Sequence, residues 1–199
     1  MSIFPQLLEE IINYFEKFPG VGRKSAERFV MCLLNMNTQD LKTLGNDILE
    51  INHRIRPCKE CNNIADSELC KICSDPQRDK SVICVVEEPK DVIAVEKIGK
   101  FRGVYHVLLG SISPLESKLP KDIDTEKLIR RVEKYPVKEV IIATDSDAPG
   151  EATAFYIKDI LKDKNVNITR IALGIPMGAD LELVDLASLS CAFENRRPI

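Results

Sequence analysis

The chain has 199 residues, of which 44% are hydrophobic and 30% are charged, as is usual for a globular protein of one or two domains. Its net charge of −3 excludes a protein that binds nucleic acid with its whole surface, so any DNA contact must come from a local basic patch. We find no apolar run of the ~20 residues that a membrane span needs and no signal peptide, and we expect a cytoplasmic protein.

Residues 1–56 are predicted to form three helices and no strand. Apolar side chains recur at helical spacing over Leu7–Phe15, over Ala26–Leu34 and over Gln39–Ile51. Pro19, with glycines close behind it, interrupts the first two runs and predicts a tight turn between them.

The turn between the first two helices carries a candidate anion site. Gly20 and Gly22 can adopt positive φ and bring backbone N–H groups close to a phosphate, and the following helix adds its N-terminal dipole. Arg23, Lys24 and Arg28 add positive charge. The segment resembles the helix–hairpin–helix motif, which binds DNA without reading its sequence. The alternative is a plain glycine-rich turn with a solvated basic rim.

Four cysteines follow in one short stretch. They form two Cys-x-x-Cys pairs separated by eight residues, and this spacing predicts a single tetrahedral thiolate site for zinc. A site closed by four sulfurs leaves no position for substrate, so its role is structural. Residues 57–79 are too poor in hydrophobic side chains to fold without the metal. The predicted ligands are Cys58, Cys61, Cys70 and Cys73.

The sequence pattern changes after residue 80, where short apolar runs alternate with segments of helical periodicity. Strands are predicted at 82–86, 104–109, 139–143 and 168–172, and helices after Pro89, at 125–135 and at 151–162. Such alternation predicts a mainly parallel four-stranded sheet with helical crossovers. The fold class is therefore a multi-part α and α/β protein.

Acidic residues follow two of these strands. Glu87 comes after the first strand, and Asp145 and Asp147 come after the third. The carboxyl ends of parallel strands lie at one edge of a sheet, so the three carboxylates could converge and hold Mg²⁺ or a partner protein. The pattern resembles the Toprim domain of topoisomerases and bacterial primases. The alternative is that these are solvated loop residues.

The order of these segments resembles the RecR family of bacterial recombination mediators over essentially the whole chain. The resemblance implies a helix–hairpin–helix DNA-binding region at 1–56, a four-cysteine zinc finger at 57–79, a Toprim domain at 80–173 and a C-terminal motif and tail at 174–199. Besides the cysteines, it is carried by Pro19–Arg28, Cys84–Pro89, Leu109–Leu115, Gly150–Ala154, Gly174–Glu182 and Glu194–Arg197.

The family resemblance implies a DNA-binding accessory protein of recombinational repair rather than an enzyme. Such proteins form homo-oligomers, dimers or tetrameric rings, around DNA. They act with RecO and RecF to help RecA load on single strands coated by the single-strand-binding protein, and the Toprim surface meets the partner proteins. Carried over by position, Lys24 and Arg28 contact single- or double-stranded DNA, with Arg23 as a third candidate.

The alternative function is a Mg²⁺-dependent Toprim nuclease or strand-transfer enzyme. The stretch from Asp145 to Pro149 is more acidic than the family pattern and keeps this alternative open. Strand transfer of this class needs a nucleophilic tyrosine, which usually lies on another domain, and this chain has no segment left for one. Its tyrosines are Tyr14, Tyr105, Tyr135 and Tyr156.

Overall fold

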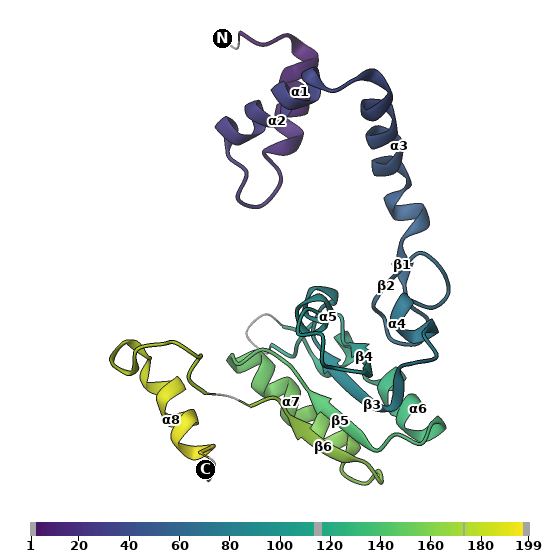
Figure 1. Cartoon of the computed structure of the whole chain (residues 1–199), viewed down its shortest axis with the longest axis vertical. Coiled ribbons are helices and arrows are strands. Elements are labelled where there is room, and N and C mark those ends of the chain that lie inside the picture. The colour runs from purple at the N-terminus through teal and green to yellow at the C-terminus, as the bar shows by residue number, and fades with distance from the viewer. Residues whose placement is uncertain (1–2, 114–116, 173, 197–199) are drawn as a thin grey trace. The chain divides into compact units, whose positions relative to one another are not determined.

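The computed structural model describes residues 3–113, 117–172 and 174–196. The motif residues Pro114, Leu115 and Arg197 lie outside these ranges. Contacts divide the chain into two units, residues 1–54 and 55–199. Figure 1 labels the elements of both.

The first unit consists of the three predicted helices, α1 (Gln6–Phe15), α2 (Arg23–Asn35) and α3 (Thr38–Arg54). Helices α1 and α2 are packed through a small core in which Ile12, Ala26 and Val30 are fully buried. Helix α3 has no buried residue although its pattern is amphipathic. The apolar side of α3 therefore finds no partner within this unit.

The second unit begins with the cysteine-rich segment. Strand β1 (Arg56–Pro57) pairs antiparallel with β2 (Ile64–Ala65), and one turn of helix, α4 (Lys71–Ser74), follows. The four cysteines and Ala65 form the buried core of this segment, and Ile72 is packed against it. In this segment, cysteine side chains form the core that aliphatic side chains form in a larger domain.

A four-stranded parallel sheet forms the rest of this unit, as the sequence predicts. The strands are β3 (Asp79–Val86), β4 (Gly103–Val107), β5 (Glu139–Ile142) and β6 (Asn167–Arg170), in the order β4-β3-β5-β6. Strand β3 begins three residues before the predicted start, and β6 ends two residues before the predicted end. The last four residues of β3 are buried, as expected of a central strand covered on both faces.

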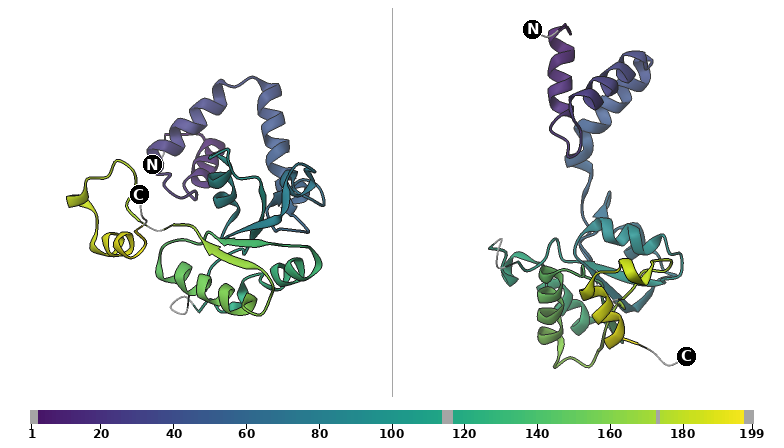
Figure 2. Two further views of the ribbon diagram at one scale, coloured as in Figure 1. Left: turned by 60° about the horizontal axis from the view of Figure 1, so that its bottom comes forward. Right: turned by 90° about the vertical axis from the view of Figure 1, so that its left-hand side faces the viewer.

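Helices cover the two faces of the sheet unequally, as Figure 2 shows. Helices α6 (Glu126–Lys134) and α7 (Ala148–Leu161) are packed on the face that carries the main core. Helix α5 (Pro89–Glu96) covers β3 and β4 on the opposite face. Helix α7 begins three residues before the predicted start because Asp147 caps it, with Oδ1 accepting the N–H of Gly150 at 2.8 Å.

The C-terminal segment contains α8 (Leu186–Glu194), and two 3-10 turns also lie in this unit, η2 (Pro120–Asp122) and η3 (Leu181–Leu183). The acids near α8 act as caps: Asp180 accepts the N–H of Glu182 at 3.2 Å, and Asp185 accepts that of Ser188 at 2.9 Å. In the described part of the chain, no helix is both long enough and apolar enough to cross a membrane.

Candidate functional site

The four cysteine sulfurs come together as the spacing predicts. They all lie within 4.8 Å of one another, and all four residues are buried. Backbone amides point at the sulfurs: the N–H of Cys70 donates to Cys58 Sγ at 3.3 Å, and that of Cys73 donates to Cys70 Sγ at 3.5 Å. Asn62 takes the turn after Cys61 in the left-handed conformation, with φ of 61°, so that the chain folds back around the sulfurs.

The electrostatics of the cluster call for a cation. Hydrogen bonding to Cys70 raises the pKa of Cys61. Hydrogen bonding to Cys61 and Cys70 raises the pKa of Cys73. Hydrogen bonds with Cys61 and Cys73 lower the pKa of Cys70. Four thiolates cannot coexist at these distances without a neutralising ion. Four buried sulfur donors in a closed cluster fit zinc in a structural role.

The zinc-binding segment covers the outer edge of strand β4. The carbonyl of Cys61 accepts the Val107 N–H at 2.8 Å, and Asn62 Nδ2 donates to the Val107 carbonyl at 2.9 Å. Arg131 from α6 donates to the Tyr105 carbonyl at 2.6 Å and lies 3.2 Å from the Glu60 carboxylate. The metal segment is therefore attached to the α/β unit through backbone groups that an open edge strand would leave exposed.

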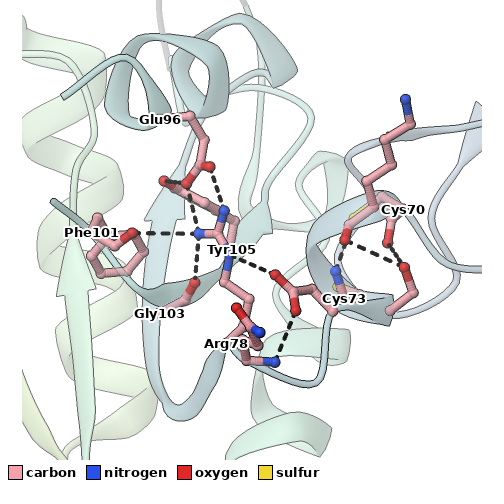
Figure 3. Close-up of polar contacts among 11 residues, drawn as sticks. Cys70, Cys73, Arg78, Glu96, Phe101, Gly103 and Tyr105 are labelled. Atoms are coloured by element: carbon pink, nitrogen blue, oxygen red, sulfur yellow. Dashed lines mark hydrogen bonds and ion pairs between the residues drawn. The ribbon is translucent and has the colours of Figure 1, made fainter. Parts of the chain in front are cut away.

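A second anchor lies where the chain leaves the zinc-binding segment, and Figure 3 shows it beside Cys70 and Cys73. Arg78 forms two hydrogen bonds to the Glu96 carboxylate, at 2.5 and 2.8 Å, and donates to the Gly103 carbonyl at 3.3 Å. Tyr105 Oη donates to the same carboxylate at 2.6 Å. The Arg78 guanidinium lowers the pKa of Glu96, so this carboxylate stays ionised. The network joins the segment to α5 and β4.

The two glycines of the turn have different conformations. Gly20 has φ of 75°, a conformation that favours glycine, as the sequence predicts. Gly22 does not have the positive φ that it could adopt: its φ is −88°, and it is the N-cap of α2 with no side-chain cap. Lys24 and Arg28 are exposed, and neither forms an ion pair with any described residue. The first turn of α2 therefore has no side-chain acceptor for its amides, and the same helix carries two exposed cations without an ion-pair partner among the described residues.

Arg23 differs from its basic neighbours. Its guanidinium lies 2.7 Å from the Glu9 carboxylate, 2.9 Å from Glu27 and 3.5 Å from Glu16, and these hydrogen bonds, with Glu9 first, raise its pKa further. The Arg23–Glu27 pair is visible in the sequence from its spacing of four residues. Glu9 and Glu16 belong to α1 and its end, so only the folded hairpin brings them to Arg23.

The three predicted acidic residues meet only in part. Glu87 Oε1 accepts the N–H of Asp145 at 3.0 Å, whereas Asp147 is engaged as the cap of α7. Burial, followed by the charges of Asp145 and Asp147, raises the pKa of Glu87. Among the described residues, the cysteine quartet is the group of three or more ligand side chains close enough to share a metal, and the three acids do not form another.

Several residues that hold these sites together are not apparent in the sequence. Asn62, Arg78 and Arg131 connect the zinc-binding segment to the sheet through hydrogen bonds to strand residues that lie 25 to 45 residues away in the sequence. An asparagine beside a Cys-x-x-Cys pair is a weak signal of a left-handed turn. The two arginines have no recognisable sequence pattern. Their role depends on burial between elements that are distant in the sequence.

Four segments of the chain, in order, match known protein families. Residues 8–51 match the helix-hairpin-helix of RecR, residues 55–75 match the four-cysteine zinc finger domain of RecR, and residues 174–197 match the RecR C-terminal family. Residues 81–172 match the Toprim domain. These domains support a recombination mediator role, DNA binding, oligomerisation, structural zinc and a Toprim unit of the non-catalytic kind. With all four parts present in the order found in RecR, the chain belongs to the RecR family.

Proposed function

We propose that this protein is a DNA clamp of recombinational repair that acts without catalysis. It assembles into a dimer or a tetrameric ring in the cytoplasm, holds single- or double-stranded DNA through its hairpins, and works with RecO and RecF to promote RecA loading on single strands. RecO and RecF dock on the Toprim surface, where Glu87, Asp145 and Asp147 serve as a partner site.

One observation supports the DNA contact above all others. The first turn of α2 has no side-chain cap, and two cations of the same helix, Lys24 and Arg28, form no ion pair with a described residue. A phosphate would satisfy the free amides of Gly22 and Lys24 and the two cations together. Arg23 is held by three carboxylates, so it shapes the hairpin and adds little free charge. Contacts of this kind recognise the backbone and therefore do not select a sequence.

The test is DNA binding by a double variant, Lys24→Glu with Arg28→Glu. We expect a large loss of affinity at fixed salt, and the slope of log affinity against log salt should flatten by about 0.9 for each lost contact with duplex DNA. The matched control is Lys42→Glu, because Lys42 is exposed on α3 of the same unit. Equal binding by the folded double variant and the wild type would show that the hairpin is not the DNA site.

The second candidate is a Mg²⁺-dependent Toprim enzyme, and the proximity of Glu87 and Asp145 favours it. Supercoiled DNA incubated with the protein and Mg²⁺ distinguishes the two functions. We expect no nicking or relaxation, because the acidic side chains of the described site do not form a ready ligand group. Cleavage that Asp145→Asn abolishes, and that the exposed control Asp159→Asn leaves intact, would contradict a clamp without catalysis.

A further inference from the structure

One edge of the four-stranded sheet is covered by other parts of the chain, and the other edge is not. The zinc-binding segment and Arg131 cover β4, whereas β6 lies outermost on the other side (Figure 1). The N–H groups of Asn167 and Ile171 donate to the carbonyls of Lys138 and Ile142 in and beside β5, at 2.9 and 3.1 Å. Because strand residues alternate, Ile168 and Arg170 direct their backbone groups outward, and these groups have no partner in the described part of the chain.

A hollow of about 250 Å³ lies beside this free edge, on the face of the sheet that α7 covers. Its floor is apolar, formed by Ile142, Ala154 and Ile168. Its rim carries Phe155, whose side chain is 67% exposed, together with Lys158 and Arg170. The hollow is large enough for one side chain of a strand added to β6.

The charges around the hollow are unbalanced. Two basic residues and no acidic residue line it. Lys158 is exposed and forms no ion pair with a described residue. Arg170 Nη1 donates to Glu151 at 2.5 Å, but its Nε and Nη2 are buried without an acceptor among the described residues. Buried guanidinium donors are normally satisfied, so the site lacks an acceptor.

We propose that β6 accepts an extended acidic segment of a partner protein as a fifth strand. The partner's backbone pairs with Ile168 and Arg170, one carboxylate enters the hollow toward Lys158 and Arg170, and a neighbouring apolar side chain covers Phe155. With four residues in β6, about 13 Å of the segment is paired. This surface lies on the Toprim unit and is independent of the DNA contact at the hairpin.

A peptide fits this edge better than a nucleic acid. The outward groups of β6 alternate between N–H donors and carbonyl acceptors, and a peptide backbone presents the same alternation. A phosphate backbone offers acceptors alone and would leave the carbonyls of Ile168 and Arg170 unpaired. The apolar floor also suits the stem of a glutamate side chain more than a charged phosphodiester.

The test uses the full chain and two synthetic seven-residue peptides of alternating threonine and valine, one with a central glutamate and one with a central lysine. Fluorescence anisotropy should show the glutamate peptide binding about tenfold more tightly. Lys158→Gln should weaken that binding about threefold or more. Lys162→Gln is the matched control just beyond the same helix, because Lys162 pairs with Asp159 and does not line the hollow.

Two further measurements test the backbone pairing. Hydrogen exchange at the Ile168 and Arg170 amides should slow when the glutamate peptide binds, and a peptide N-methylated at alternate residues should not bind. Equal binding of the glutamate and lysine peptides, unchanged amide exchange, or binding of the N-methylated peptide would each overturn the proposal. Displacement of the peptide by single-stranded DNA from the Lys24→Glu, Arg28→Glu variant would do so too, because it would reveal a nucleic-acid site.

Discussion

At the residue scale, adjacent basic residues of the hairpin have different roles. Arg23 contacts Glu9, Glu16 and Glu27, whereas Lys24, the next residue, is exposed and unpaired among the described residues. The sequence places both in one basic cluster, because spacing along the chain does not reveal carboxylates contributed by α1. A candidate DNA contact is therefore identified as much by the absence of an acidic neighbour as by its own charge.

The acidic residues show the same limit of prediction. Strand order correctly places Glu87 and Asp145 at the carboxyl ends of neighbouring strands. What sequence reasoning could not predict is that Asp147 would turn back to cap α7. The close approach of Gly150 to Asp145 makes this turn possible, since a Cβ on Gly150 would lie 2.0 Å from the Asp145 carbonyl oxygen. Local backbone geometry thus removes one ligand from the predicted triad.

His106 is a buried histidine of strand β4 that neither the sequence nor the candidate sites explain. Its Nε2 donates to the Asp124 carbonyl at 2.6 Å, and its Nδ1 is buried with no partner among the described residues. Burial lowers its pKa from 6.5 to about 4. The histidine therefore stays neutral in the folded protein at pH values where the unfolded chain already protonates it.

This pKa predicts a loss of stability in mild acid. Because the folded pKa lies below the unfolded one, stability is complete above pH 6.5 and falls as the pH is lowered toward 4. We expect a loss of about 2 kcal/mol in the free energy of unfolding between about pH 7 and pH 5, measured by urea denaturation. His106→Gln should remove this loss, while His53→Gln, at an exposed site, should not.

Other groups also titrate in this range, so the difference between wild type and variant carries the conclusion. Burial raises the pKa of Glu87, which contributes in the opposite sense, and protonation of the cysteines releases zinc. Both effects are common to wild type and variant. Parallel stability curves for the two proteins would show that His106 is not the group responsible.

At the scale of elements, the sequence predicts the zinc-binding segment but not its attachment. Cysteine spacing alone specifies the cluster, because ligand geometry is local. The contacts of Cys61, Asn62 and Arg131 with β4 depend on tertiary structure and have no sequence signature. The finger is thus more than a link between the hairpin and the sheet, since it also covers a strand edge.

Removal of the metal should therefore destabilise the neighbouring edge of the sheet as well as the zinc-binding segment. Chelation, or Cys61→Ser, is expected to unfold residues 57–79, lower the thermal unfolding temperature and speed hydrogen exchange at the Val107 amide. Cys32→Ser is the control, because Cys32 is exposed and lies outside the cluster. Thermal stability and Val107 exchange that stay unchanged after verified zinc loss would contradict a structural role for the metal.

At the scale of the whole molecule, the exposed apolar surface of α3 predicts self-association. Leu44, Ile48 and Leu49 are among the apolar residues that α3 leaves more than a third exposed, and no residue of α3 is buried. An apolar surface of this kind on a helix marks an interface. The oligomerisation expected of the family needs such a surface, and α3 provides one.

Light scattering should therefore report a particle of at least two chains of 22.4 kDa each, with and without DNA. Ile48→Lys should lower the mass of the particle, because it places a charge in the apolar surface, and it should weaken DNA binding through loss of multivalency. The exposed control Lys42→Gln should leave the mass unchanged. A monomer in the wild-type sample at working concentration would rule out assembly through α3.

The unequal edges of the sheet also determine where a strand can be added to it. With β4 covered, addition is confined to β6. Loss of zinc would uncover the backbone groups of Val107 and expose part of a second edge to pairing with other chains. The metal ion would then limit edge-to-edge aggregation as well as unfolding.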